Sequence, residues 1–173
     1  MRGSLLFMSK SLYLIRHAHA EDHIEHSDKD RHLTPKGKSQ CESLSQLMAE
    51  RSLECDLALV STARRTLETF ENMDLDIAKV EEERLYSGGP DDYLEILRGV
   101  ERGYSDVMLI GHNPTCAMLS IQLAQAGAPN DLLSLRGGFR KGQLAAFHFD
   151  VEEWSDIQPR SAFLSEIILP EDC

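Results

Sequence analysis

The sequence predicts an α/β fold, specifically a three-layer α/β/α sandwich with a largely parallel central sheet. Short apolar runs carry this prediction, because four apolar residues in a row are typical of a strand that is buried on both faces of a parallel sheet. These runs lie at 12–15, 57–60 and 107–110. A segment with helical spacing of apolar residues follows each run, and strands that alternate with helices form parallel sheets covered on both faces.

The remaining elements can be placed in order along the chain. Thr34 and Pro35 are typical of an N-cap and a first helical position, and this helix is expected to run to about Arg51. Further helices are expected at 62–72, from Pro90 onward, and at 115–126. The other expected segments are a long loop at 18–31, an irregular acidic stretch at 74–90, a turn region rich in Gly and Pro after 126, a core strand at 144–149 and a stretch compatible with an edge strand at 163–169.

Length and composition limit the functions to consider. The 173 residues fit one domain, 1–173, with 1–10 as an N-terminal extension. The net charge of −11 argues against a nucleic-acid binder and against docking to anionic lipid, so an anionic substrate would need a local cluster of cations.

No apolar run suits a signal peptide or a membrane span. The cysteines lack metal-site spacing and are interpreted as thiols in a reducing compartment: Cys41, Cys55, Cys116 and Cys173. We therefore expect a cytoplasmic protein.

Arginine and histidine follow the predicted strands at their carboxyl ends, where ligands bind in open α/β sheets. Arg16 and His17 follow the first apolar run, Arg64 and Arg65 follow the second, and His112 follows the third. Parallel strands end at the same edge of a sheet, so these side chains can converge on one pocket. Guanidinium forks and imidazoles at such an edge suit the oxygens of a transferring phosphoryl group without a metal.

The sequence resembles the histidine phosphatase superfamily (branch 1), and within it the small SixA-like phosphohistidine phosphatases. The resemblance covers residues 12 to about 149 and implies a phosphoglycerate mutase-like fold. Four ordered motifs carry it: Arg16-His17-Ala18, Arg31-His32-Leu33-Thr34-Pro35-Lys36-Gly37, Ser61-Thr62-Ala63-Arg64-Arg65-Thr66-Leu67-Glu68-Thr69, and Gly111-His112-Asn113-Pro114.

The resemblance also implies roles for individual residues. His17 would be the nucleophile that accepts the phosphoryl group and passes it to water, while Arg16, Arg65 and His112 would hold the phosphoryl oxygens, with Asn113 in the substrate-binding set. We expect His17 to attack as a neutral imidazole whose tautomer is fixed by a backbone carbonyl, and we expect His112 to serve best as a cation beside the phosphate. The implied enzyme is a metal-independent phosphatase that needs no cofactor and acts on protein-borne phosphohistidine.

Two positions depart from the family pattern, and no general acid can be assigned. Thr62 replaces the usual Pro and Glu68 replaces the usual Gln, which leaves the shape of that turn open. The acidic run Glu81-Glu82-Glu83 lies near the region where larger relatives carry an acid, but none of its carboxylates aligns. Because an imidazole leaving group is readily protonated by solvent, the lack of an assigned acid favours phosphohistidine as the substrate.

Other functions stay open at this point. The motifs describe the phosphoryl group rather than its carrier, so a small-molecule phosphomonoesterase of the same superfamily is one alternative. His17 and His19 could instead begin the site of a metal-dependent hydrolase, although that leaves Arg16 and Arg65 unexplained. A non-catalytic phosphoprotein-binding module is a third alternative, against which the retained His17 argues. The histidines of the loop are interpreted as solvated residues near the pocket mouth: His19, His23, His26 and His32.

Overall fold

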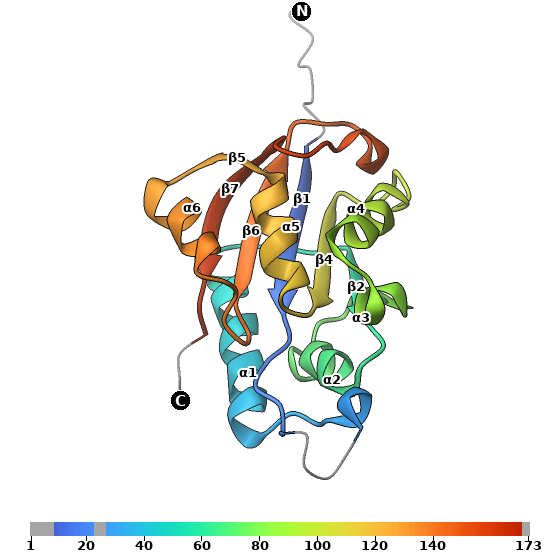
Figure 1. Ribbon diagram of the computed structural model, residues 1–173, viewed down its shortest axis with the longest axis vertical. Coiled ribbons are helices and arrows are strands. Elements are labelled where there is room, and N and C mark those ends of the chain that lie inside the picture. Colours follow the sequence, from blue (N-terminus) through green and yellow to red (C-terminus); the bar gives the residue numbers. More distant parts are fainter. Residues whose placement is uncertain (1–8, 23–26, 171–173) are drawn as a thin grey trace, which may run out of the picture.

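The computed structural model describes residues 9–22 and 27–170, and within them the chain forms one mixed sheet of seven strands. The strands follow the order β3-β2-β4-β1-β6-β7-β5 across the sheet (Figure 1). Their bounds are β1 Lys10–Arg16, β2 Leu57–Ser61, β3 Ala78–Glu82, β4 Asp106–Gly111, β5 Ala124–Gly127, β6 Leu144–Phe149 and β7 Ala162–Ile168. The first residue of β1 lies within the segment that the sequence analysis assigned to an N-terminal extension.

The half of the sheet that holds the sequence motifs is parallel. β1 pairs with β4, and β2 pairs with both β4 and β3, all in parallel. β6 runs antiparallel to β1 and to β7, while β5 and β7 are parallel. Arg16 of β1 lies opposite Gly111 of β4, so these two strands end at the same edge. The predicted largely parallel central sheet is confirmed.

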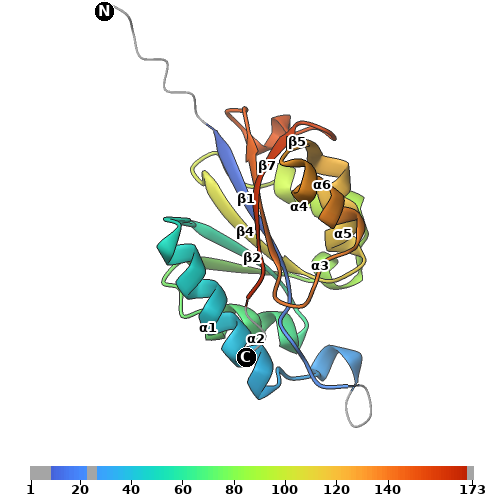
Figure 2. The ribbon, with the colours of Figure 1, turned by 90° about the vertical axis from the view of Figure 1, so that its left-hand side faces the viewer.

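Helices cover both faces of the sheet and complete the predicted sandwich (Figure 2). On one face lie α1 Pro35–Glu50 and α2 Arg64–Asn72. On the other lie α3 Arg84–Ser87, α4 Pro90–Arg98, α5 Thr115–Leu123 and α6 Pro129–Arg136. Short 3-10 turns occur at η1 Asp28–Asp30 and η2 Trp154–Asp156. No helix among the described residues is long and apolar enough to cross a membrane.

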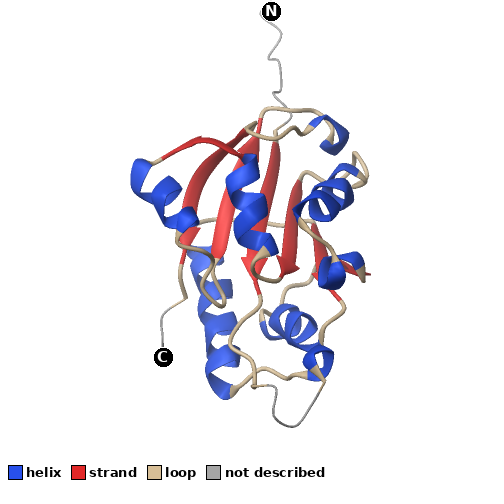
Figure 3. Ribbon diagram, in the orientation of Figure 1, coloured by secondary structure: helices blue, strands red, loops and turns tan. Residues whose placement is uncertain are grey.

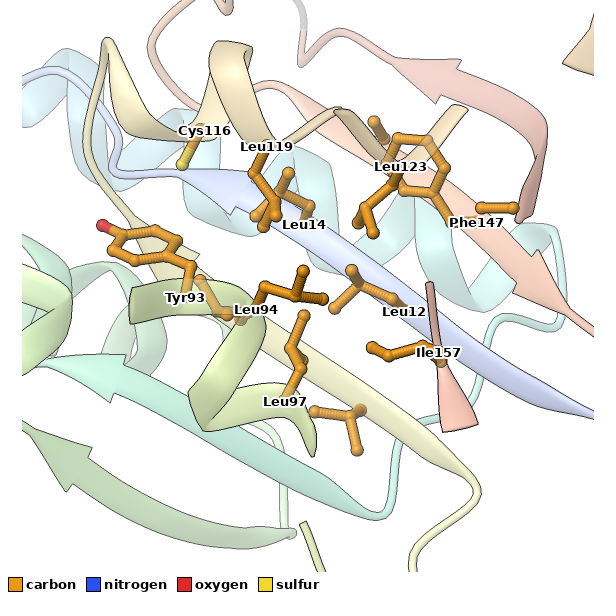
Figure 4. Packing of buried hydrophobic residues seen from close by; sticks show 14 of the residues in the cluster. Leu12, Leu14, Tyr93, Leu94, Leu97, Cys116, Leu119, Leu123, Phe147 and Ile157 are labelled. Atoms are coloured by element: carbon orange, nitrogen blue, oxygen red, sulfur yellow. The ribbon is translucent and has the colours of Figure 1, made fainter. Parts of the chain in front are cut away.

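The central strand β1 is buried from both sides because its apolar residues alternate between two cores. Leu12 and Leu14 pack with residues of α4 and α5, as Figure 4 shows, while Tyr13 and Ile15 pack with residues of α1 and α2. Each of these four side chains is at most 3% exposed. Because β1 is packed on both faces, its last residue, Arg16, and the two residues that follow it are held in a fixed position at the sheet edge.

The first helix begins as the sequence predicts. Thr34 is the N-cap, and its Oγ1 accepts a hydrogen bond from the Gly37 amide at 3.2 Å. Pro35 is the first helical residue, where its missing N–H costs nothing and its fixed φ suits the helix. The helix ends at Glu50, one residue before the predicted end.

The expectation of an irregular segment at 74–90 is wrong, because it contains β3 and α3. β3 is an edge strand whose residues are mostly exposed, and Val80 itself is 48% exposed. An edge strand that buries so little apolar surface lacks the hydrophobic run by which the interior strands are recognised.

The second half of the chain also differs from expectation at three places (Figure 3). The helix expected to reach residue 126 ends at Leu123, and β5 begins at once. The expected turn region contains the helix α6. β7 is not at an edge of the sheet, because it lies between β6 and β5. Short segments rich in Ala, Gly and Pro carry little periodicity, so tertiary pairing decides their structure.

Candidate active site

A pocket of about 480 Å³ lies at the carboxyl edge of β1, β2 and β4. The structure brings together in its lining all five of the predicted site residues, together with three that were not predicted. The lining residues are Arg16, His17, Asp28, Arg31, Arg65, Tyr86, His112 and Asn113.

His17 follows the last residue of β1 and is a buried residue of the pocket lining. Its Nδ1 lies 2.8 Å from the Ala18 carbonyl oxygen. A carbonyl can only accept, so Nδ1 carries the proton and Nε2 keeps its lone pair. Burial is the main cause that lowers the pKa of His17 well below its usual value. The imidazole is therefore neutral, with Nε2 available as a nucleophile, as the sequence analysis expected of the tautomer.

Arg16 and Asn113 are held by one carbonyl group from the loop between α6 and β6. Arg16 donates from one terminal nitrogen to the Phe139 oxygen at 2.7 Å, and Asn113 Nδ2 donates to the same oxygen at 2.9 Å. The Gly142 amide of this loop donates to the Arg16 carbonyl at 3.1 Å, with the glycine in a left-handed conformation at φ +76°. The loop thus fixes both the backbone and the guanidinium of Arg16.

Arg65 reaches the pocket from the first turn of α2, whereas its neighbour Arg64 does not line it. Arg65 is buried and Arg64 is exposed. The guanidinium of Arg65 donates to the Asp28 carbonyl oxygen at 2.6 Å and to Asp28 Oδ2 at 3.1 Å. The structure therefore places Arg65 where the motif alignment puts the second arginine.

Among its protein partners His112 is neutral, whereas the sequence analysis expected it to be a cation beside the phosphate. Its Nδ1 lies 3.2 Å from a terminal nitrogen of Arg65, which can only donate, so Nδ1 must accept. Nε2 then carries the proton and donates to Ser61 Oγ at 2.7 Å. Burial, reinforced by the charge of Arg65, lowers the pKa of His112 to about 3.

Asp28 is a pocket residue that the sequence analysis missed. It accepts hydrogen bonds from Arg31 NH2 at 2.8 Å and from the Tyr86 hydroxyl at 3.0 Å, in addition to that from Arg65. Partial burial by itself would raise the pKa of Asp28, but the Arg31 hydrogen bonds and the charge of Arg65 outweigh it and lower the pKa to about 2. In the sequence, the only feature that points to Asp28 as a pocket residue is its position three residues before Arg31 of the second motif.

None of the carboxylates of the acidic run at 81–83 lines the pocket. Glu83 forms an ion pair with Lys29 at 2.7 Å and accepts a hydrogen bond from Thr62 Oγ1. These two hydrogen bonds lower the pKa of this exposed carboxyl group. Glu81 pairs with Lys79.

Glu68, the second departure from the family pattern, ties a loop to α2. Its Oε2 accepts from the Leu33 amide at 2.7 Å, and its Oε1 lies 2.6 Å from His32 Nδ1. The residues that replace the usual Pro and Gln thus make contacts around the pocket without lining it.

The histidines expected near the pocket mouth are dispersed. His19 Nδ1 lies 2.8 Å from Thr34 Oγ1, and His19 is not among the lining residues. His23 and His26 lie outside the described residues. Over 9–22 and 27–170, no group of three or more His, Cys, Asp or Glu side chains is arranged to hold a metal ion.

The charge of the pocket suits a doubly charged anion. Its lining contains three guanidinium groups, of Arg16, Arg31 and Arg65, and one carboxylate, of Asp28. With both imidazoles neutral, two positive charges are left without a negative partner in the lining. A phosphoryl group carries about two negative charges near neutral pH, and paired guanidinium groups are its usual ligands in proteins.

Comparison with known proteins gives consistent matches. A family model described as the histidine phosphatase superfamily (branch 1) matches residues 12–86. An uncharacterized protein of Mycobacterium tuberculosis is 26% identical over 158 residues, which cover 90% of this chain and 99% of the relative.

Solved structures with 27% sequence identity share the fold over most of both chains. The structure of a proposed phosphohistidine phosphatase SixA from Nakamurella multipartitia matches with a TM-score of 0.82, over 94% of this chain and 96% of its own. A proposed SixA from Agrobacterium tumefaciens matches with a TM-score of 0.77, over 93% and 99%.

Proposed function

The chain belongs to the histidine phosphatase superfamily (branch 1) and is a phosphatase, and on that premise we propose that it hydrolyses protein-borne phosphohistidine through a phosphoryl group held covalently on His17. Under this proposal His17 Nε2 attacks phosphorus with its lone pair while the bond to the leaving imidazole nitrogen breaks. The leaving nitrogen takes a proton from solvent. Water then attacks the phosphorus atom and gives up a proton to solvent, the bond between phosphorus and Nε2 breaks, and inorganic phosphate leaves with the neutral imidazole of His17 restored.

The surrounding groups support this proposal by their placement. Arg16 and Arg65 present guanidinium donors to the pocket that His17 also lines. The Ala18 carbonyl keeps its hydrogen bond to Nδ1–H as the imidazole acquires positive charge during attack. Donors that are fixed before the reaction stabilise the transferring charge without reorganisation.

The observation that carries the choice of phosphohistidine is the ionised state of Asp28. It is the only carboxylate among the described lining residues, and Arg31, Arg65 and Tyr86 all donate to it. A carboxylate with a pKa of about 2 is a poor donor to an alkoxide leaving group, which needs a proton to leave. An imidazole leaving group accepts a proton from water readily, so it does not need an acid from the enzyme.

A substrate panel tests this proposal. It compares kcat/KM for a phosphohistidine-bearing protein, a phosphohistidine peptide, free phosphohistidine, an aryl phosphate and an alkyl phosphate, each with the rate of His17→Ala subtracted. We expect the protein and peptide substrates to be preferred, and the alkyl phosphate to be the slowest. An alkyl phosphate turned over as well as phosphohistidine would favour a small-molecule phosphomonoesterase instead.

A further inference from the structure

Gln40 is a buried polar residue of α1 that makes no contact with the pocket, yet it holds a peptide group next to the nucleophile. Its Oε1 accepts a hydrogen bond from the His19 amide at 2.9 Å, and the residue is 4% exposed. The His19 amide and the Ala18 carbonyl belong to the same peptide group, and in a trans peptide they point in opposite directions. Gln40 therefore holds one end of the peptide whose other end accepts the proton of His17 Nδ1.

Thr69 of α2 holds the preceding peptide group in the same way. Its Oγ1 accepts a hydrogen bond from the Ala18 amide at 3.1 Å. The hydroxyl proton of Thr69 goes to the Arg65 carbonyl oxygen at 2.6 Å, which leaves the oxygen lone pairs for Ala18. Both peptide groups that flank Ala18 are thus held by side chains of the two helices on one face of the sheet.

The approach of α1 to this segment is close enough to prevent a shift. A Cβ on Gly37 would lie 2.0 Å from the His19 carbonyl oxygen, so only glycine fits at this position of the helix. The Thr34 amide also donates to that oxygen at 3.1 Å. These contacts fix the next peptide group, His19–Ala20, so that His19 is held at its carbonyl group as well as at the amide that Gln40 accepts from.

We propose that Gln40 is a positioning residue which, together with Thr69, orients the Ala18–His19 peptide so that His17 keeps its proton on Nδ1 and presents an unprotonated Nε2 to the substrate. The tautomer of a neutral histidine is set by the hydrogen bond that the other nitrogen makes. If the carbonyl turns away, the proton can move to Nε2, and the lone pair needed for attack is lost. This proposal rests on the assignment of His17 as nucleophile, but the tautomer itself can be measured without any substrate.

The main test compares two substitutions of Gln40. Gln40→Leu keeps the size of the side chain and removes the acceptor, whereas Gln40→Glu keeps an acceptor oxygen in either protonation state. For Gln40→Leu we expect kcat to fall about 10- to 100-fold, as when the orienting partner of a metal-bound histidine is removed, with KM changed less than about twofold. We expect Gln40→Glu to restore kcat to within about fivefold of the wild-type value.

The tautomer provides a readout that loss of stability would not move. In protein labelled with ¹⁵N-histidine, the two ring-nitrogen shifts of His17 report which nitrogen carries the proton. Wild type and Gln40→Glu should show Nδ1–H, and Gln40→Leu should show a substantial population of Nε2–H.

Thr69→Val gives an independent test with a matched control on the same helix. Thr66 is also fully buried, but its hydroxyl donates to the Ser61 and Ala63 carbonyl oxygens and accepts nothing from the loop at Ala18. Thr69→Val should lower kcat and shift the His17 tautomer, whereas Thr66→Val should change only the unfolding free energy. This pair keeps the test available even if Gln40→Leu does not fold.

Two outcomes would overturn the proposal. One is a folded Gln40→Leu or Thr69→Val protein with the wild-type tautomer and the wild-type kcat. The other is a loss of kcat with an unchanged tautomer and no rescue by Gln40→Glu, which would indicate a purely structural role. If the wild-type protein turns over no phosphohistidine substrate, the proposed function fails, while the ¹⁵N shifts still decide how His17 is positioned.

Discussion

The guanidinium of Arg65 donates to His112 Nδ1 at 3.2 Å, and this contact adds to the effect of burial in keeping the imidazole neutral. A cation directly beside a buried ring makes protonation of that ring unfavourable, and the pKa of His112 falls to about 3. Because Ser61 accepts a hydrogen bond from Nε2, both ring nitrogens of His112 form hydrogen bonds within the protein. The positive charge of the pocket therefore comes from its arginines and not from its histidines.

The first prediction concerns the stability of the protein in acid and follows from the neutral state of the His112 imidazole. In the unfolded chain His112 binds a proton below its ordinary pKa of about 6.5, whereas in the folded chain it does not until about pH 3. The unfolded state thus gains protons as the pH falls, and acid destabilises the fold, by at most about 1.4 kcal/mol per pH unit for each such imidazole. The lowered pKa of His17 acts in the same direction.

The measurement is urea unfolding between pH 6.5 and 4.5. The unfolding free energy of the wild type should decrease over this range, and that of His112→Asn should decrease less steeply. The slopes are compared rather than the absolute values, because the substitution alters packing as well. Equal slopes in the two proteins would show that His112 is protonated in the folded state.

The second prediction concerns the two neighbouring arginines of α2. Arg65→Ala should lower kcat/KM about 100- to 1,000-fold, because it removes a preorganised donor to the transferring phosphoryl group. Arg65→Lys should restore little, since a point charge does not reproduce the guanidinium fork. Arg64→Ala is the matched control and should change kcat/KM by less than about threefold, because Arg64 is exposed and outside the pocket lining. The reverse ranking of the two alanine variants would contradict the placement of Arg65.

The centre of the fold could be predicted from sequence because its strands are completely buried, and the resemblance to the family then indicated which residues at the strand ends form the pocket. Strands such as 12–15 and 107–110 are buried on both faces, so each shows an uninterrupted apolar run that ends where the site begins. β3 and β5 could not be predicted, because they are the edge strands and bury few side chains.

The missed features of the site depend on contacts between distant segments. Asp28 lies in a loop without periodicity, and its partners Arg65 and Tyr86 are 37 and 58 residues away in sequence. The hydrogen-bond partners of His112 were not predicted, for the same kind of reason. The motif shows that a histidine is present, but only the fold shows that Arg65 lies against its Nδ1.

A third prediction tests whether Asp28 acts as a general acid. Asp28→Asn keeps the size of the side chain and removes a negative charge beside Arg65. An anion should therefore bind more tightly, with the inhibition constant of tungstate lowered about threefold to tenfold, and kcat on phosphohistidine should be retained within about fivefold. A general acid would behave differently, because its loss would lower kcat for an alkyl phosphate far more than for phosphohistidine.

A fourth prediction concerns metal ions. Because the proposed clamp uses guanidinium groups, exhaustive treatment with a chelator should leave kcat unchanged, and vanadate should inhibit by resembling the transferring phosphoryl group. Activity that is lost to the chelator and restored by zinc would support the alternative of a metal-dependent hydrolase whose site includes His17 and His19.

The most direct test of the account is to trap the phosphoenzyme. The protein is mixed with a ³²P-labelled phosphohistidine protein, quenched in alkali within milliseconds, and digested so that the labelled residue can be identified. We expect acid-labile, alkali-stable label on His17, which forms and decays at rates compatible with turnover. His19→Ala should keep this label, and His17→Ala should lose both the label and the turnover. Label on another residue, or appreciable turnover by His17→Ala, would contradict the account.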